Sequence, residues 1–154
     1  MNKDQLISEL VADEGEVLAV YLCSAGHETC GVGHMIIKTD PEYGWPLDAP
    51  ITKERSNELL SEDLKIVLAD CAWVFNGFED LPDEVQLIVA NMMFNLGRPR
   101  FQKFVNFIAA VEDADWQEAA RQMKDSRWHV QLPERSSRLI ARMEAVEIKI
   151  ATTQ

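Results

Sequence analysis

The sequence Asp13–His34, DEGEVLAVYLCSAGHETCGVGH, places several chemically distinct groups in one short stretch. It contains a carboxylate at Glu14, a thiol at Cys23, a hydroxyl at Thr29 and the turn sequence GVGH at 31–34. The other segments have the apolar spacing of ordinary helices. This stretch therefore decides where the chain departs from a helical pattern, and we expect any chemistry to lie here.

The residues before Glu14 predict an amphipathic helix. Leu6 and Leu10 recur at helical spacing, and Glu14 falls four residues after Leu10 on the same face. Gly15 follows at the place where a helix commonly ends in the left-handed conformation. The electronegative helix end and the apolar neighbours both favour the protonated carboxyl that a general acid needs. The alternative is a solvated glutamate without a catalytic role.

After Gly15 the apolar period changes from helical spacing to alternation, which is typical of strands. The pattern predicts a small antiparallel meander with strands at 17–21, 29–32 and 35–37 and a turn at 24–27. Gly33 separates the last two strands. A sheet of this size needs a helix to pack against.

The rest of the chain predicts helices joined by short breaks. A helix of roughly twenty residues follows Thr52, which is a typical N-cap residue. Further helical segments begin at Pro82, cover 101–111 after a break at 97–99, cover 116–123 and 126–130, and begin again at Pro133.

Composition is that of a compact, acidic protein. The chain has 154 residues, 47% of them hydrophobic, and a formal net charge of −11. Residues 1–96 carry 5 basic and 18 acidic side chains, whereas residues 97–154 carry 10 and 8. No stripe of basic residues is present to neutralise phosphates, which argues against nucleic acid as a partner. No segment approaches the roughly 20 apolar residues of a membrane span, so no membrane insertion is expected.

Three cysteines, Cys23, Cys30 and Cys71, argue for free thiols rather than a disulfide framework. Cys30 and Cys71 have the surroundings of buried residues. The N-terminal residues 1–5 lack the apolar core of a secretory signal, so we expect the chain to accumulate in the cytoplasm of the cell that makes it.

Two other chemistries use the same stretch. Cys23, His27, Cys30 and His34 are zinc-type ligands, although their spacing matches no common zinc finger. A Cys–His peptidase would need a thiolate at Cys23 and a nearby base, and the Glu14 carboxylate would disfavour that thiolate.

Glu14, Cys23, Thr29 and GVGH at 31–34 resemble the catalytic signature of the phage-type lysozymes, glycoside hydrolase family 24. Four later segments match in order and approximate spacing: PITK at 50–53, NMMFNLG at 91–97, Trp116 with EAA at 118–120, and SRW at 126–128 before QLPER at 131–135. The link 40–50 is shorter than in the best-known phage members, which insert a helix there.

The resemblance implies an α+β, mainly α, lysozyme-like fold with two lobes in a single domain, 1–154. A small β-meander lobe would cover 13–50. A larger helical lobe would cover 1–12 and 51–154, including the long helix that joins the lobes.

The resemblance also implies a peptidoglycan hydrolase that cleaves the β-1,4 bond between N-acetylmuramic acid and N-acetylglucosamine. Glu14 would be the general acid, and Cys23 and Thr29 would hold the attacking water, with inversion at the sugar carbon. Cys23 stands where many members have an aspartate. Its role as base, nucleophile or water-positioning group stays open, because a free thiol is mostly neutral at pH 7.

The resemblance implies roles for further residues. For each of them the alternative is a residue that only packs in the core or faces solvent. His34 would pair with Asp63 on the long helix, Arg135 would approach Glu14, and Asn95 and Trp128 would lie near the site. Sugar contacts would come from Met35, Phe94, Phe107 and Gln122. A small serine is usual at Phe107 and an asparagine at Gln122.

The implied partner is peptidoglycan, with no cofactor, no metal and a monomeric chain. Release to the periplasm through a separate membrane-permeabilising protein would lead to cell lysis. Two alternatives come from another class of function. One is a wall-binding protein in which Cys23 has abolished the activity, and the other is a tail-associated virion component.

Overall fold

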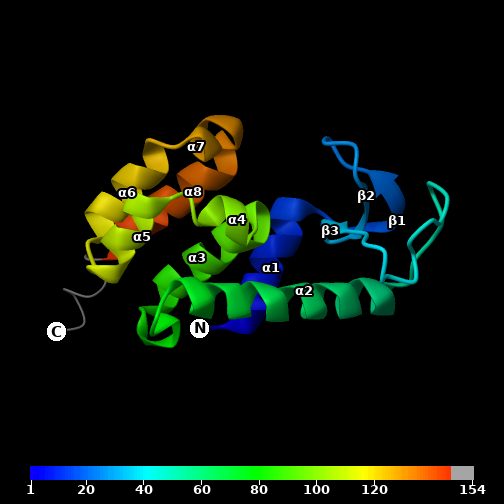
Figure 1. The fold of residues 1–154 in the computed structure, drawn as a ribbon, viewed down its shortest axis with the longest axis horizontal. Helices are drawn as coiled ribbons and strands as arrows, with labels where there is room; N and C mark the ends of the chain where they lie inside the picture. Colours follow the sequence, from blue (N-terminus) through cyan, green and yellow to red (C-terminus); the bar gives the residue numbers. More distant parts are fainter. Residues whose placement is uncertain (147–154) are drawn as a thin grey trace. The chain divides into compact units, whose positions relative to one another are not determined.

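Eight α-helices and one three-stranded antiparallel sheet form the described part of the chain, residues 1–146, in the computed structural model (Figure 1). The predicted α+β, mainly α fold is therefore confirmed. The predicted single domain extends over residues 147–154, which lie outside the described residues, and its bounds stay a prediction.

Backbone contacts divide the chain into two units. The N-terminal unit is residues 4–66, and the C-terminal unit is residues 1–3 together with the chain from residue 67 onward. This division groups most of the first helix with the sheet, whereas the resemblance assigns 1–12 to the helical lobe. The lobe boundaries at 13 and 50 stay a prediction.

The N-terminal unit contains the first helix, the sheet and the start of the long helix. Its elements are α1 (Lys3–Glu14), β1 (Val17–Leu22), β2 (Glu28–Gly31), β3 (His34–Met35) and α2 (Lys53–Val74), which continues into the C-terminal unit. As predicted, α1 ends just before Gly15, whose φ is 74° and whose N–H donates to the Val11 carbonyl at 2.9 Å. Thr52 caps α2, because its hydroxyl accepts from the Arg55 N–H at 3.0 Å.

The third strand is shorter than predicted and begins earlier, at His34–Met35 instead of 35–37. The Ile36 N–H still donates to the Glu28 carbonyl of β2 at 2.9 Å. The Ile37 N–H instead donates to the Asp40 carboxylate at 2.9 Å. Successive N–H groups of a strand point to opposite edges, so the Ile37 N–H faces away from β2, and there it binds the Asp40 carboxylate.

The link 40–50 runs along the free edge of β1. The Val20 N–H donates to the Ala49 carbonyl at 2.9 Å, and the Ile51 N–H donates to the Leu18 carbonyl at 3.1 Å. Beneath the sheet, apolar side chains from all these segments pack on the start of α2. The core residues are Val20, Cys30, Ile36, Ile51 and Leu59. The predicted burial of Cys30 is confirmed.

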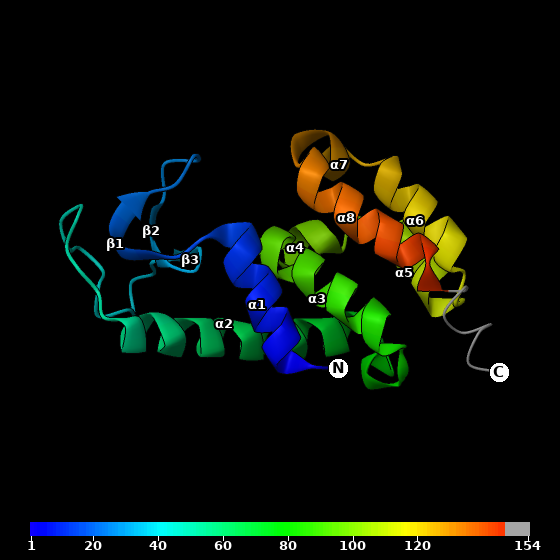
Figure 2. The same cartoon turned by 180° about the vertical axis from the view of Figure 1, so that it is seen from behind.

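The C-terminal unit is helical, and α8 packs against α3, α6 and α7 (Figure 2). Its helices after α2 are α3 (Asp83–Leu96), α4 (Arg98–Phe101), α5 (Val105–Glu112), α6 (Trp116–Lys124), α7 (Arg127–Gln131) and α8 (Pro133–Glu144), with a 3-10 turn at Phe78–Asp80. Asp115 and Ser126 cap α6 and α7 by accepting backbone N–H groups at 3.1 Å.

The predicted continuous helical segment 101–111 is wrong, because the chain breaks between α4 and α5. Phe104 has φ −79° and ψ 56°, which no helix accommodates. The predicted break at 97–99 is also only partly right, since α4 begins at Arg98 with Pro99 in its first turn. The apolar residues keep helical spacing across the break between α4 and α5. They do so because Phe101, Phe104 and Phe107 all pack in one aromatic cluster.

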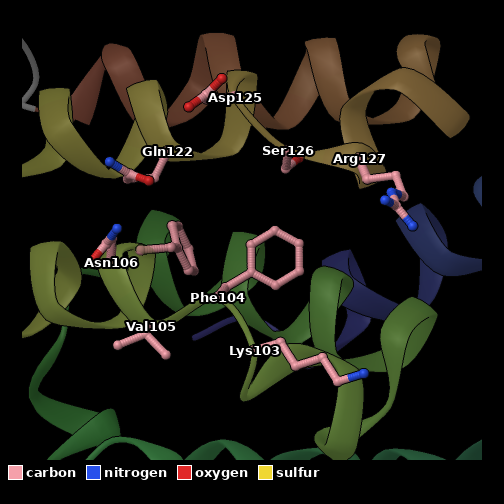
Figure 3. A pocket seen from close by; sticks show the side chains of 9 residues that line it. Lys103, Phe104, Val105, Asn106, Gln122, Asp125, Ser126 and Arg127 are labelled. Carbon is pink, nitrogen blue, oxygen red and sulfur yellow. The ribbon is translucent and has the colours of Figure 1, made fainter.

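A pocket of about 270 Å³ opens beside this cluster in the C-terminal unit. Residues at the start of α5 form one wall, and the end of α6 with the following turn forms the other (Figure 3). Asn106 and Gln122 face each other across it, with the Phe104 ring between the walls.

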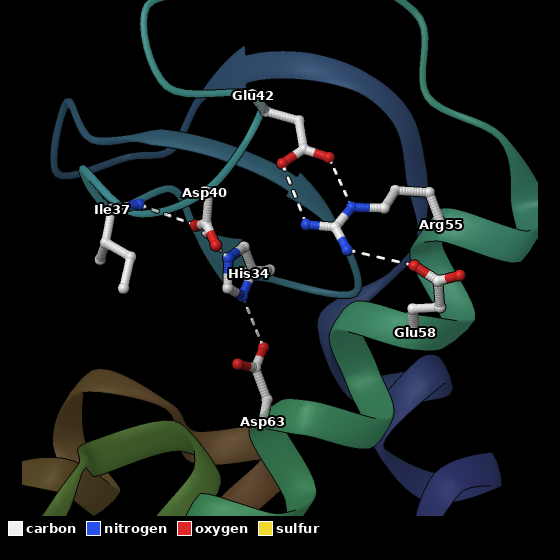
Figure 4. Close-up of polar contacts among 7 residues, drawn as sticks. All are labelled: His34, Ile37, Asp40, Glu42, Arg55, Glu58 and Asp63. Carbon is white, nitrogen blue, oxygen red and sulfur yellow. Dashed lines mark hydrogen bonds and ion pairs between the residues drawn. The ribbon is translucent and has the colours of Figure 1, made fainter.

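A charged network fixes the sheet to α2 in the N-terminal unit (Figure 4). His34 Nδ1 contacts Asp63 Oδ2 of α2 at 2.8 Å, and His34 Nε2 contacts Asp40 Oδ2 at 2.7 Å. The predicted pairing of His34 with Asp63 is therefore confirmed. Nearby, Arg55 donates two hydrogen bonds to Glu42 at 2.6 and 3.2 Å. The network joins β3, the link and α2.

The two carboxylates keep His34 protonated. Burial alone would lower the pKa of His34, but the hydrogen bonds and charges of Asp63 and Asp40 outweigh it and raise the pKa to about 9. For Asp40, burial is likewise outweighed by the Ile37 N–H and His34, so its pKa is lowered. At neutral pH both ring nitrogens of His34 therefore donate to carboxylates.

We predict that Phe101→Ala lowers the free energy of unfolding by about 3–5 kcal/mol, because it opens a cavity among buried rings. Phe101 is fully buried, with its ring centroid 6.0 Å from those of Phe75 and Phe107. Urea unfolding measures the change. Val105→Ala, at a side chain that is 67% exposed, is the control and is expected to change the value by less than about 0.5 kcal/mol.

We also predict an alkaline loss of stability that depends on His34. The pKa of His34 is about 9 in the folded protein, against 6.5 for an ordinary histidine such as that of the unfolded chain. Between pH 6.5 and pH 9 the folded state therefore keeps a proton that the unfolded state loses. The stabilisation is complete below pH 6.5 and disappears as the pH rises through 9, a change of about 3 kcal/mol.

Urea unfolding of wild type and His34→Asn at pH 6 and pH 9.5 tests this. The variant is expected to be less stable at pH 6 and to lose less stability than wild type at pH 9.5. Its remaining alkaline loss comes from the buried thiols of Cys30 and Cys71, whose pKa values burial raises. His27→Asn, at an exposed histidine, serves as the control. An equal alkaline loss in wild type and His34→Asn would contradict the assignment.

Candidate active site

Glu14 is the last residue of α1 and is half-buried. Its position follows from the local sequence, because Gly15 ends the helix and Val17 begins β1 immediately afterwards. The carboxylate therefore projects at the junction between a helix and the first strand.

The chain just after Glu14 is anchored to α2. Glu16 accepts from Lys53 Nζ at 2.6 Å and from Ser56 Oγ at 2.7 Å, and Ser56 is fully buried. The hydrogen bonds from Lys53 and Ser56 lower the pKa of Glu16. Sequence reasoning missed this anchor, because the partners are some forty positions apart and form no motif.

Both glycines of the turn 31–34 make close approaches that a side chain would obstruct. A Cβ placed on Gly33 would lie 3.0 Å from Glu14 Oε2, and one placed on Gly31 would lie 3.1 Å from Ser56 Oγ. Both glycines have positive φ, 63° at Gly31 and 62° at Gly33. The turn therefore lies between the end of α1 and the anchor on α2.

Cys23 and Thr29 lie on either side of the turn that joins β1 to β2. The Cys23 N–H donates to the His27 carbonyl at 2.9 Å, and Thr29 Oγ1 donates to the same carbonyl at 2.9 Å. Backbone hydrogen bonds at His27 and Ala25, with a smaller contribution from the Thr29 hydroxyl, lower the pKa of the Cys23 thiol. The structure thus brings two of the three predicted catalytic residues together.

Tyr21 lies beside this group in the sheet, and sequence reasoning missed it. Tyr21 is opposite Thr29 in the β1–β2 ladder. Burial raises the pKa of Tyr21, and the negative charges of Cys23 and Glu14 raise it further. A neutral phenol therefore lies within the electrostatic reach of both groups. The only sequence signal was its place two residues before Cys23 on the strand.

The zinc and peptidase alternatives find no support in this geometry. Both ring nitrogens of His34 are engaged by carboxylates, so His34 is not available as a metal ligand. Within residues 1–146, no group of three His, Cys, Asp or Glu side chains is placed to hold a metal ion. The lowered pKa of Cys23 arises from backbone and hydroxyl hydrogen bonds, and not from the neighbouring imidazole that a Cys–His peptidase uses.

The sugar-contact candidates have unequal exposure. Met35, in the N-terminal unit, is 51% exposed, whereas Phe107 of the C-terminal unit is almost fully buried among phenylalanine rings. Gln122 donates to Glu118 at 2.8 Å and lines the pocket, and Phe94 is half-buried on α3. These four roles stay predictions.

The supporting candidates of the C-terminal unit make defined contacts within it. Trp128 Nε1 donates to Asn95 Oδ1 at 2.9 Å, and Arg135 Nε donates to Asn91 Oδ1 at 2.9 Å, where both residues are buried. The first contact joins two residues that sequence reasoning placed near the site. The expected approach of Arg135 to Glu14 stays a prediction.

No helix within residues 1–146 combines the length and the apolar character that crossing a membrane requires. This agrees with the hydropathy of the sequence.

Comparison with known proteins identifies relatives along almost the whole chain. The chain is 28% identical to "Probable T4-type lysozyme 2" of Dictyostelium discoideum, over 89% of this chain and 92% of that protein. It is 27% identical to "Probable T4-type lysozyme 1" of the same organism, over 86% and 89%. It is 23% identical to the "Pre-baseplate central spike protein Gp5" of Enterobacteria phage T4, over 98% of this chain and 30% of that protein.

The sequence profile described as phage lysozyme matches residues 11–145, which include Glu14, Cys23, Thr29 and every segment that carried the resemblance after them. Because this match covers most of the chain, the protein belongs to the phage lysozyme family.

Proposed function

We propose that this protein is a muramidase that cleaves the β-1,4 bond between N-acetylmuramic acid and N-acetylglucosamine in peptidoglycan. Membership of the phage lysozyme family supports a peptidoglycan hydrolase of this kind. The observation that carries the residue assignment is the grouping of these side chains in one unit. Cys23 and Thr29 share the His27 carbonyl, Tyr21 lies opposite Thr29, and Glu14 lies against the turn at Gly33.

In the proposed reaction, Glu14 donates its proton to the glycosidic oxygen as the bond to the anomeric carbon breaks. Water attacks that carbon from the opposite face of the ring and loses a proton to a base, so that one water is added across the bond and the configuration inverts. Thr29 supports the water through its hydroxyl. Its donation to the His27 carbonyl leaves lone pairs that accept from a water molecule.

Cys23 is the base in this scheme. Its lowered pKa increases the thiolate fraction at neutral pH relative to an ordinary cysteine. The thiolate accepts the proton that the attacking water releases, as a carboxylate does in an inverting glycosidase. If the thiolate attacked the anomeric carbon instead, a thioglycoside would form and its hydrolysis would retain the configuration.

Met35, Phe94, Phe107 and Gln122 are proposed to contact the glycan, with His34, Asp63, Asn95, Trp128 and Arg135 in supporting roles. The support is their correspondence to family positions, together with the exposure of Met35 and the position of Gln122 in the pocket wall. Breakdown of the wall would then lyse the bacterial cell, after release of the chain from the cytoplasm.

We predict that Glu14→Gln abolishes peptidoglycan cleavage, with a loss of at least about 1,000-fold, because the amide N–H is far too weak an acid to protonate the leaving oxygen. Products of purified peptidoglycan are read by mass spectrometry, and reducing muramic acid ends are expected from wild type. Glu54→Gln, at an exposed acid in the first turn of α2, is the matched control and is expected to keep full activity.

Other products would contradict the proposal in distinct ways. Anhydro ends would indicate a lytic transglycosylase, and peptide-bond cleavage that persists in Glu14→Gln would indicate a peptidase. Wall binding without cleavage by wild type would indicate a binding protein.

For Cys23 we predict that Cys23→Ala lowers kcat about 100-fold and that Cys23→Asp keeps activity. Because a carboxylate is ionised at lower pH than a thiol, the acidic limb of the pH–rate profile is expected to move to lower pH in Cys23→Asp. NMR of the initial product is expected to show the α-anomer. A β-anomer as first product, or a thioglycoside in Cys23 enzyme, would show that the thiolate is a nucleophile.

A further inference from the structure

The backbone at Gly33 lies directly against the carboxyl group of Glu14. A Cβ built on Gly33 would be 3.0 Å from Glu14 Oε2 and 3.5 Å from both Cβ and Cδ of Glu14. The first of these distances is shorter than ordinary van der Waals contact between carbon and oxygen. Any side chain at position 33 would therefore occupy space that the carboxyl needs.

We propose that Gly33 is a positioning residue for Glu14, because its missing side chain fixes where the acid's carboxyl oxygen lies. This inference rests on the proposed function, since it concerns the acid of that reaction. It gives Gly33 a role beyond its turn conformation. A glycine needed only for its φ of 62° would not have to face a carboxyl.

Gly33 is held from both directions and has little freedom to retreat. On one side, His34 pairs with Cys30 in the β2–β3 ladder, and its ring is bound by Asp40 and Asp63. On the other side, Gly31 closely approaches Ser56, which is itself hydrogen-bonded to Glu16. The flexible end of the Glu14 side chain is therefore the partner that moves when a methyl group is added.

A displaced carboxyl affects catalysis more than folding. Rotating the end of a glutamate side chain has a low energetic cost, whereas proton transfer requires hydrogen-bond distance to the glycosidic oxygen. Misplacement by about 1 Å is enough to lower a rate about 100-fold. The expected signature of Gly33→Ala is therefore a fall in kcat that exceeds any fall in stability.

Gly44 provides a matched control. Its φ is 83°, so alanine there is strained in the same way as at Gly33, but nothing lies within 4 Å of its added Cβ. Gly44 belongs to the same unit and lies in the link, and a Cβ added there would contact none of the proposed catalytic residues. Gly33→Ala and Gly44→Ala therefore share the backbone strain and differ in the contact with Glu14.

The experiment compares wild type, Gly33→Ala and Gly44→Ala in thermal unfolding, in peptidoglycan hydrolysis and in crystal structures. Both variants are expected to lose a similar few degrees in Tm. Only Gly33→Ala is expected to lose kcat, by about 10- to 100-fold with KM within about two-fold of wild type. Its crystal structure is expected to show the Glu14 carboxyl displaced, with the backbone at 33 unchanged.

Several results would overturn the inference. They are wild-type kcat in Gly33→Ala, an unmoved Glu14 carboxyl, or kcat losses in both variants that simply follow Tm. If Gly33→Ala does not fold, Gly33→Asn replaces it, because asparagine tolerates positive φ better while adding the same Cβ. If wild type itself shows no hydrolysis, the proposed function fails, while the carboxyl position in the crystal structures still decides the role of Gly33.

Discussion

The His34 ring, held between Asp40 and Asp63, is the interaction on which the N-terminal unit depends. It joins a two-residue strand, the irregular link and α2, in addition to the apolar core that these segments share. Burial opposes a charged imidazole, so the pair of carboxylates must outweigh that cost for the arrangement to exist. Because Asp40 also accepts from the Ile37 N–H, the same carboxylate joins the chain just after β3 to the start of the link.

In this unit, acidic side chains join the short segments to α2 through hydrogen bonds and ion pairs. Glu42 is buried against Arg55, and Glu16 binds Lys53 and Ser56, so each short segment is joined to α2 by a carboxylate. This explains why so much negative charge is compatible with a stable fold, because the acids that the fold buries have partners on α2. A formal net charge of −11 disfavours long-range electrostatic attraction to an anionic cell wall, the proposed substrate. Under the proposed function, recognition of the glycan therefore depends on short-range contacts.

Features that depend only on neighbouring residues in the chain were predicted correctly from the sequence. Gly15 and Thr52 mark helix ends by their own conformational and capping preferences, and both were correct. The resemblance supplied the pairing of His34 with Asp63. Asp40 and the Ser56–Glu16 anchor were missed, because such contacts depend on how distant segments fold together. The break at Phe104 was missed for a related reason, since the phenylalanine spacing reflects one shared cluster and not one continuous helix.

The environments of Glu14 and Cys23 differ in a way that bears on the proposed division of labour. Glu14 meets glycine backbone that is fixed by the His34 network, so its position is set by steric contact. Cys23 lies in a turn whose backbone hydrogen bonds lower its pKa, so its ionisation is set by local dipoles. Such donors stabilise a carboxylate as readily as a thiolate. A turn with this geometry therefore accepts either aspartate or cysteine as a base, and this gives a physical reason why a thiol can stand where other family members have an acid.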